Sequence, residues 1–121
     1  MALAKDIMGG GFSGGQAQAI AGSRNTSISA AGTTQGTATA LTASFNIVST
    51  VGSGAGVILY DASLGDSQIV YNGGANALTI YPPVGDAINQ VAANGGVTLT
   101  TNTMMILFKT STTQWNAILS A

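Results

Sequence analysis

The sequence predicts an all-β protein: a small β-sandwich, jelly-roll-like or barrel-like module behind an extended N-terminal arm. Three observations lead to this expectation. Short stretches of alternating or continuous apolar residues recur at spacings of about ten residues. Clusters of Gly, Asn, Ser and Pro separate these stretches, as turns do between strands. No stretch places apolar residues with the period of a helix of useful length.

Residues 1–36 are rich in Gly, Ala, Ser and Thr and have no strand or helix period, so we interpret them as an extended arm before a β module at 37–121. Two interpretations of the arm stay open. Such a composition often remains disordered in solution. Alternatively, the arm becomes ordered on a partner, and the side chains expected to contact that partner are Phe12, Ile20, Arg24 and Ile28.

The first strands are expected soon after residue 37. Apolar and polar residues alternate in Leu41–Ile47, which is typical of a half-buried strand. Val57–Tyr60 is a short, continuous apolar run, which is typical of a strand covered on both faces. The glycine-rich stretch at 52–56 resembles a phosphate-binding loop only superficially, because a strand and not a helix N-terminus follows it.

A hairpin is expected next, with strands at 68–71 and 77–81 joined by a turn at 72–76, where Asn and Gly tolerate positive φ. Pro82 and Pro83 end the second strand because neither can donate to a ladder. Residues 84–93 are expected to form a loop or one short helical turn. The last three expected strands are Val97–Thr101, Met104–Thr110 and Gln114–Leu119.

Charge is scarce: Asp, Glu, Lys and Arg together make up 6% of the chain. Lys109 is the only charged residue inside an expected strand, so charge hardly protects the strand edges from pairing. Closing those edges against identical neighbours would solve this problem, and we therefore expect a homo-oligomer. Thr, Ser, Asn and Gln supply neutral polarity that can form subunit contacts without desolvating charge.

The same composition excludes several functions. Glu, His and Cys are absent, which removes the commonest general base, metal ligand and thiolate nucleophile, so we expect no catalytic residue, cofactor or metal site. The loop Asp61–Asp66 weakly resembles a calcium loop but is better explained as an Asp-stabilised turn. Asp66 and Asp86 are not a convincing catalytic pair. Three cations are too few for nucleic-acid binding, and the apolar runs are too short to span a membrane.

Large aromatic side chains are few. Tyr71, Tyr81 and Trp115 are expected in the core or in an oligomer interface, where aromatic burial contributes most. The alternative is an exposed carbohydrate-binding patch.

A longer pattern runs through the second half of the chain. It consists of Gly65-Asp66, a strand ending in Tyr71-Asn72, a glycine-rich turn, Tyr81-Pro82-Pro83-Val84-Gly85, Ile88-Asn89 and a late Thr113-Gln114-Trp115. This pattern resembles a module of small tailed-bacteriophage virion proteins, and the likeness covers about residues 57–121. Gly-Phe-Ser-Gly-Gly at 11–15 and Gly-Thr-Thr-Gln-Gly at 32–36 also resemble short phage head proteins. Gln90 departs from the pattern, which often has Gly there, and this affects only the local loop shape.

The resemblance implies a capsid decoration (cement) protein, often trimeric, on the outer capsid surface of the virion. Its implied partners are two further copies of itself in a homotrimer and the major capsid protein, with the arm tying neighbouring capsid subunits. The same module also occurs in tail-fibre and spike proteins, so the alternative is a module that binds a host receptor or glycan. A fibre needs a long shaft, which this sequence lacks.

Overall fold

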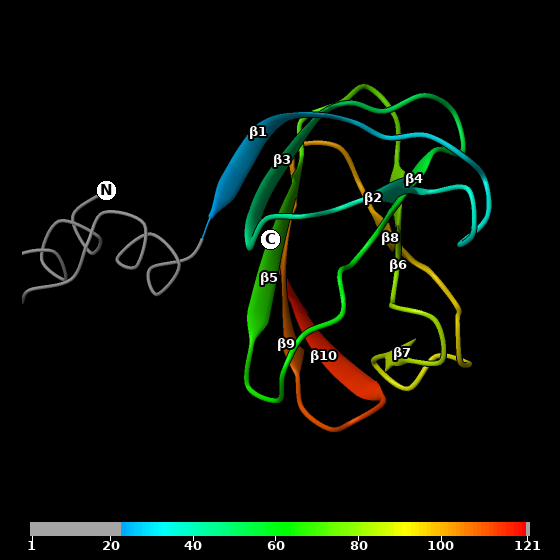
Figure 1. Ribbon diagram of the computed structural model, residues 1–121. Helices are drawn as coiled ribbons and strands as arrows, with labels where there is room; N and C mark the ends of the chain where they lie inside the picture. The colour runs from blue at the N-terminus through cyan, green and yellow to red at the C-terminus, as the bar shows by residue number, and fades with distance from the viewer. Residues whose placement is uncertain (1–22, 121) are drawn as a thin grey trace, which may run out of the picture.

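The computed structural model describes residues 23–120 as ten β-strands, with no helix among those residues (Figure 1). The all-β prediction is therefore confirmed for the described part of the chain. The strands are β1 (Arg24–Ser29), β2 (Thr39–Ala40), β3 (Phe45–Thr50), β4 (Gly56–Ile58), β5 (Ser67–Asn72), β6 (Leu78–Tyr81), β7 (Ala87–Ile88), β8 (Val97–Leu99), β9 (Met104–Lys109) and β10 (Gln114–Leu119).

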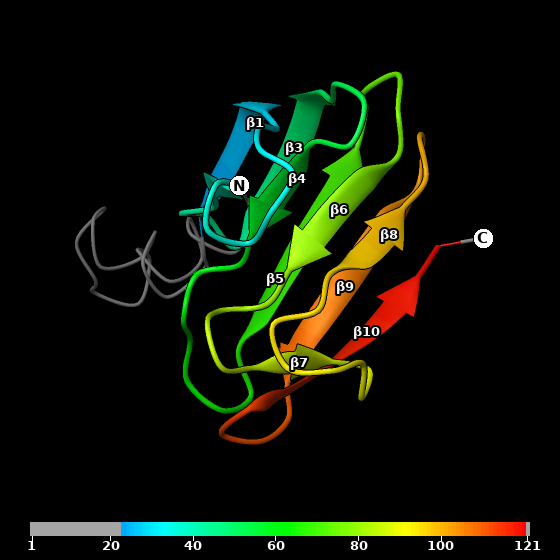
Figure 2. The same ribbon diagram turned by 90° about the vertical axis from the view of Figure 1, so that its right-hand side faces the viewer.

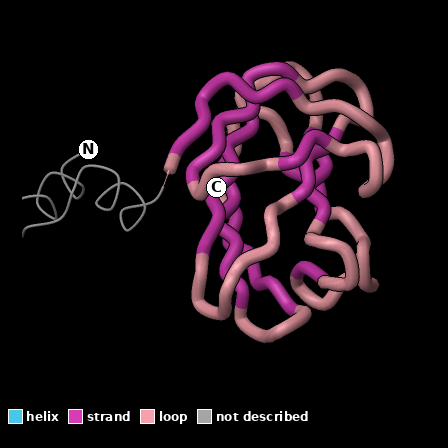
Figure 3. Tube along the Cα trace, in the orientation of Figure 1, coloured by secondary structure: helices cyan, strands magenta, loops and turns pink. Residues whose placement is uncertain are grey.

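The strands form two sheets that lie in two layers (Figure 3). Sheet A has the order β1-β3-β5-β9-β10-β7, and sheet B has the order β2-β4-β6-β8. From β1 to β9 the chain alternates between the two sheets. The pairs β1–β3, β3–β5, β2–β4 and β4–β6 are all parallel, so the first six strands wind like the coils of a solenoid (Figure 2). Strands β8 and β9 then pair antiparallel with β6 and β5, and β10 closes a hairpin with β9.

The hairpin expected at residues 68–81 is wrong, because β5 and β6 lie in different sheets. Side-chain hydrogen bonds turn the chain from one sheet into the other. The buried Asn72 amide donates to the carbonyls of Asn76 and Leu99, both at 2.9 Å, and accepts from the Gly74 N–H at 2.9 Å. Asn76 in turn donates to the Val51 carbonyl at 2.8 Å. These bonds replace the backbone ladder that a hairpin would have formed.

Two further amide side chains are fully buried and bind loop backbone in the same way. Gln68 donates to the Tyr60 carbonyl at 2.8 Å and accepts from the Tyr60 N–H at 3.3 Å. Asn46 donates to the Ala43 carbonyl at 2.8 Å. Buried polar groups are usually paired, and here the amide N–H groups are paired with backbone carbonyls, while Asn46 Oδ1 is buried without a hydrogen-bond partner. These connections between the sheets are thus each held by a different amide side chain. The successive coils therefore need no common sequence motif, and the sequence shows no repeat.

The N-terminal boundary also differs from the expected one. Strand β1 pairs with β3, and Ile28 packs in the core with only 6% of its surface exposed. Ala31 forms an isolated bridge with Gly56. Residues 24–36 therefore belong to the β fold and not to a separate arm, because β1 needs Ile28 to anchor it to the layer beneath. The rest of the expected arm, including Phe12 and Ile20, lies outside the described residues.

The core lies between the two sheets. Val48, Val70 and Leu107 contribute from sheet A, and Val57, Ile80 and Leu99 contribute from sheet B, all fully buried. Trp115 from β10 is also 0% exposed, which places it in the core and not in an interface.

The segment expected as a loop or helical turn at 84–93 holds the short strand β7, which pairs with the start of β10. Gln90 adopts a left-handed φ of 64°. That conformation favours glycine, which is the residue that the phage pattern often has there.

Candidate interaction surface

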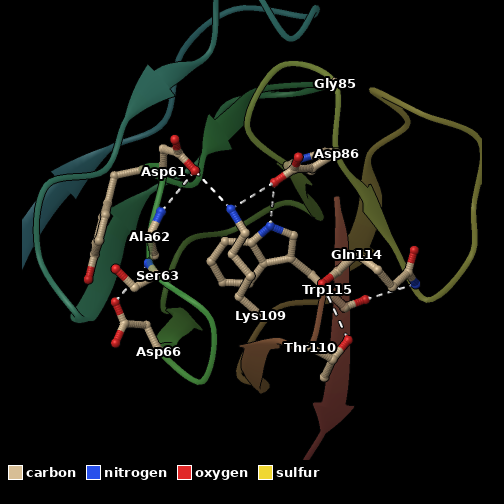
Figure 4. A network of polar contacts seen from close by, with 12 residues as sticks. Asp61, Ala62, Ser63, Asp66, Gly85, Asp86, Lys109, Thr110, Gln114 and Trp115 are labelled. Atoms are coloured by element: carbon tan, nitrogen blue, oxygen red, sulfur yellow. Dashed lines mark hydrogen bonds and ion pairs between the residues drawn. The ribbon is translucent and has the colours of Figure 1, made fainter. Parts of the chain in front are cut away.

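Two features outside the apolar core could carry function, and the first is a polar cluster at one end of sheet A (Figure 4). The Lys109 Nζ lies 2.9 Å from Asp61 Oδ1 and 3.7 Å from Asp86 Oδ2. The Trp115 Nε1–H donates to Asp86 Oδ2 at 2.9 Å, and Lys109 Nζ lies 5.9 Å from the centroid of the Trp115 ring. Asp86 and Lys109 are buried, whereas the Asp61 side chain is exposed. We call these four residues the Lys109 cluster.

The electrostatics of the Lys109 cluster favour a structural role. The hydrogen bond to Asp61 and the nearby carboxylates raise the pKa of Lys109. The same contact lowers the pKa of Asp61. Lys109 therefore stays protonated and is a poor nucleophile or base at neutral pH. The cluster connects the loop after β4, the residue before β7 and the β9–β10 hairpin. We interpret its role as holding these three segments together.

The expected Asp-stabilised turn at residues 61–66 is confirmed. The Ser63 N–H donates to Asp66 Oδ2 at 3.0 Å, and the Ala62 N–H donates to Asp61 Oδ1 at 3.0 Å. Within residues 23–120 there is no group of three or more acidic side chains that could hold a metal ion. The same part of the chain has no helix long and apolar enough to cross a membrane.

The second feature is the outer side of sheet A. Side chains that point away from the core on β3, β5, β9 and β10 meet in rows across the strands, as the pairing registers require. One row crosses all four strands, a second crosses three, and Phe108 begins a third. We call this set of eight apolar side chains the sheet A face: Phe45, Ile69, Ile106 and Ile118 in the first row, Ile47, Tyr71 and Met104 in the second, and Phe108.

The sheet A face is open to solvent in the described structure. Ile118 is 63% exposed and Phe108 is 39% exposed, while the other six side chains are half-buried. Sheet B covers the opposite side of sheet A, and within residues 23–120 no strand or loop lies over the outer side (Figure 1). The outermost side chains of the face are roughly 15 Å apart both across the four strands and along them. This is the scale of the largest apolar patches on monomeric proteins, which are often functional.

The sheet A face carries no charge. Its remaining outward positions, Ser49, Ser67, Gln114 and Asn116, are neutral. Arg24 on β1 pairs with Phe45 and is exposed, so of the four residues expected to contact a partner it is the one that the structure places beside this surface. Ile28 is buried and cannot contact a partner in this fold.

The two tyrosines expected in the core or interface have different environments. Tyr71 belongs to the sheet A face. Tyr81 lies on the outer side of sheet B, where its hydroxyl donates to the Thr33 carbonyl at 3.0 Å. Its ring lies so close to Gly56 and Gly96 that an added Cβ on either would contact it, at 2.8 Å and 3.0 Å. Tyr81 therefore makes contacts within its own chain.

Sequence reasoning missed the sheet A face because it assigned the inward side of β3 wrongly. Leu41 and Ala43 are buried as the alternation predicts, but Phe45 and Ile47 point outward and Asn46 points inward. The signal that could have found the face is the run Met104–Phe108. It is apolar at both odd and even positions, although only one side of β9 is covered by sheet B.

Comparison of the chain with family models, with curated proteins and with solved structures returned no match. Function must therefore be argued from the residues and contacts of this chain.

Proposed function

We propose that this chain is a non-enzymatic structural protein of a bacteriophage virion: a capsid decoration protein that binds the outer shell as a homotrimer and stabilises it. The observation that carries the proposal is the sheet A face, an uncharged apolar surface on the largest sheet of the fold. Apolar area left in water costs about 25 cal/mol per Å². A protein that keeps such a face works with the face covered, which is the condition of a subunit in an assembly.

The choice of a virion within that class is supported by the pattern at residues 65–89 and 113–115, which resembles small phage virion proteins. The scarcity of charge is consistent with the same role. Contacts made by neutral side chains are little affected by salt, which screens charges beyond about 8 Å at physiological ionic strength.

The proposed mechanism is mass action. A protein that binds only the assembled shell stabilises it by RT ln(1 + [L]/Kd) per site, about 3 kcal/mol when the free concentration is a hundred times Kd. Three linked copies bind with avidity, because the second and third contacts form at a high effective concentration. Weak individual contacts with the major capsid protein then add up to a lasting attachment.

The test is to locate the protein on purified particles of the phage that encodes it. Electron microscopy with an antibody against this chain should label the outer shell in a regular array. Particles stripped of the protein should open at a lower temperature, and adding it back should restore the original value. Label confined to the tail would instead favour the receptor- or glycan-binding tail module. Particles that lack the protein altogether would refute both virion roles.

A further inference from the structure

We propose that the sheet A face is the surface through which copies of this chain contact one another, so that the occupant of the face is a second copy and not the shell. The inference deepens the proposed function by naming the partner of this surface, and it rests on the homotrimer of that proposal. It makes no use of the capsid, so the two can be tested apart.

The charge distribution favours a like partner. Of the five charged residues in the described chain, Asp61, Asp86 and Lys109 are committed to the Lys109 cluster, and Asp66 accepts from Ser63 in its own loop. None of the five lies among the outward side chains of β3, β5, β9 and β10. The fifth, Arg24 on β1, is exposed at the margin of the face beside Phe45, so a charged partner would meet one positive charge at that margin and none within the face. A second sheet A face, equally neutral and apolar, needs none.

The shape of the surface also fits. Two sheets that pack face to face interdigitate their side chains at a separation of about 10 Å. The sheet A face supplies aliphatic and aromatic rows on adjacent strands, with Ile69 and Ile106 in the middle and Ile118 at one side. Such rows form the inner layer of β-sandwiches, so the faces of three copies turned toward one threefold axis would complete a core between them.

The contact extends to the free edge of β10. The Ser120 N–H donates to the Met104 carbonyl, which means that the backbone groups of even-numbered residues on β10 point toward β9. The backbone N–H and C=O of Leu119 therefore point away from β9, at a part of β10 with which β7 does not pair. Leu119 is itself 53% exposed beside Ile118. Covering the face and this edge in two copies would remove on the order of 1,000 Å² from solvent, the least that a stable interface needs.

The test is the mass of the full-length chain in solution, without any shell, by size-exclusion chromatography with light scattering from 1 to 100 µM. The wild type should have three times the chain mass of 11.9 kDa. Ile118→Asp places a charge at an exposed position of the face, which a folded single chain tolerates, and should raise the dissociation constant at least 100-fold. Val84→Asp is the matched control, because Val84 is 79% exposed in the loop after β6, off the face.

A second measurement on the wild type covers the case in which Ile118→Asp fails to fold. Hydroxyl-radical labelling should modify Met104 more slowly at 100 µM than at 1 µM. Leu64, which is 60% exposed and off the face, should keep one rate.

Three results would overturn the inference: a wild type of single-chain mass at 100 µM, an oligomer that Ile118→Asp leaves as intact as Val84→Asp does, or protection of Met104 that is independent of concentration. The last would assign the face to residues 1–22 of the same chain. If the oligomer dissociates as expected but the protein is absent from particles, the self-contact stands and only the virion role fails.

Discussion

Removal of the lysine from the Lys109 cluster should destabilise the fold more than removal of both buried charges together. In Lys109→Met, the Asp86 carboxylate stays buried, with the Trp115 indole as its remaining side-chain donor. Breaking a buried ion pair by removing one partner costs about 3–5 kcal/mol. We expect about 3 kcal/mol here, because Lys109 reaches the surface at its contact with the exposed Asp61 and water can enter there.

The partner variant isolates the cause. Asp86→Asn keeps an acceptor for the Trp115 N–H and removes the charge, while Lys109 retains Asp61, so it should cost about 1 kcal/mol. The double variant leaves no uncompensated buried charge and should cost about 2 kcal/mol, less than the sum of the single changes. The exposed Arg24 provides the control, and Arg24→Met should change the free energy of unfolding by less than about 0.5 kcal/mol.

The assay is urea unfolding at one fixed protein concentration, followed by fluorescence. Trp115 is the single tryptophan and is fully buried, so its emission shifts when the core opens. Additive costs, with the double variant near 4 kcal/mol, would refute the buried-charge argument. A loss under about 1 kcal/mol in Lys109→Met would mean that water already solvates the cluster.

Three further predictions concern pH, a tight glycine and a buried amide. The pKa of Lys109 is raised above 10.5 in the folded state, so the stability that this contributes is lost as pH rises through the folded-state pKa. The pKa of Asp61 is lowered below 3.8 in the folded state, so the stability that this contributes is lost as pH falls through the folded-state pKa. With no His or Cys side chain, the urea midpoint should stay flat from about pH 5 to 9, and a step near pH 6.5 would contradict this. Gly56→Ala, whose new Cβ would lie 2.8 Å from an aromatic ring, should lower the free energy of unfolding by about 1–3 kcal/mol; Gly52→Ala, with open space around it, should cost less, and equal losses would argue against the close contact. Asn72→Ala removes two donated bonds and one accepted bond in the core and should cost about 3 kcal/mol by the same assay, whereas a loss under about 1 kcal/mol would mean that water replaces the amide.

Much of the strand content could be predicted from the sequence, because the relevant signals are local. The apolar run at Val57–Tyr60 overlaps β4 at residues 57 and 58, and the last three expected strands overlap β8, β9 and β10. The turn around Asn102 has a left-handed φ of 61°, which Asn tolerates better than most residues. Backbone conformation at turns and strands depends on neighbouring residues, so it can be read from a short stretch of sequence.

The arrangement of the strands could not be predicted, because it depends on contacts between residues far apart in the chain. Asn72-Gly73-Gly74 suits a hairpin by composition, and only the bond from Asn72 to the Leu99 carbonyl, 27 residues away, turns it into a corner between sheets. The outward position of Phe45 could not be predicted from the local sequence either. The polar Asn46 points inward because its side-chain amide donates to the Ala43 carbonyl, and Phe45 therefore points outward. The Lys109 cluster joins Asp61 to a lysine 48 residues later.

The winding of the chain between the sheets has a consequence for how the protein folds. Arg24 pairs with Phe45, and Phe45 pairs in turn with Ile69, so each early coil finds its partner in the coil that was synthesised just before it. Each of these connections spans fewer residues than the one that brings β9 to β5, so closing it costs less entropy. Strand β9 is the exception, because it pairs with β5, which lies much earlier in the chain. The last third of the chain therefore determines when folding is completed, and a ribosome-bound chain would keep the edge of β5 unpaired until β9 emerges.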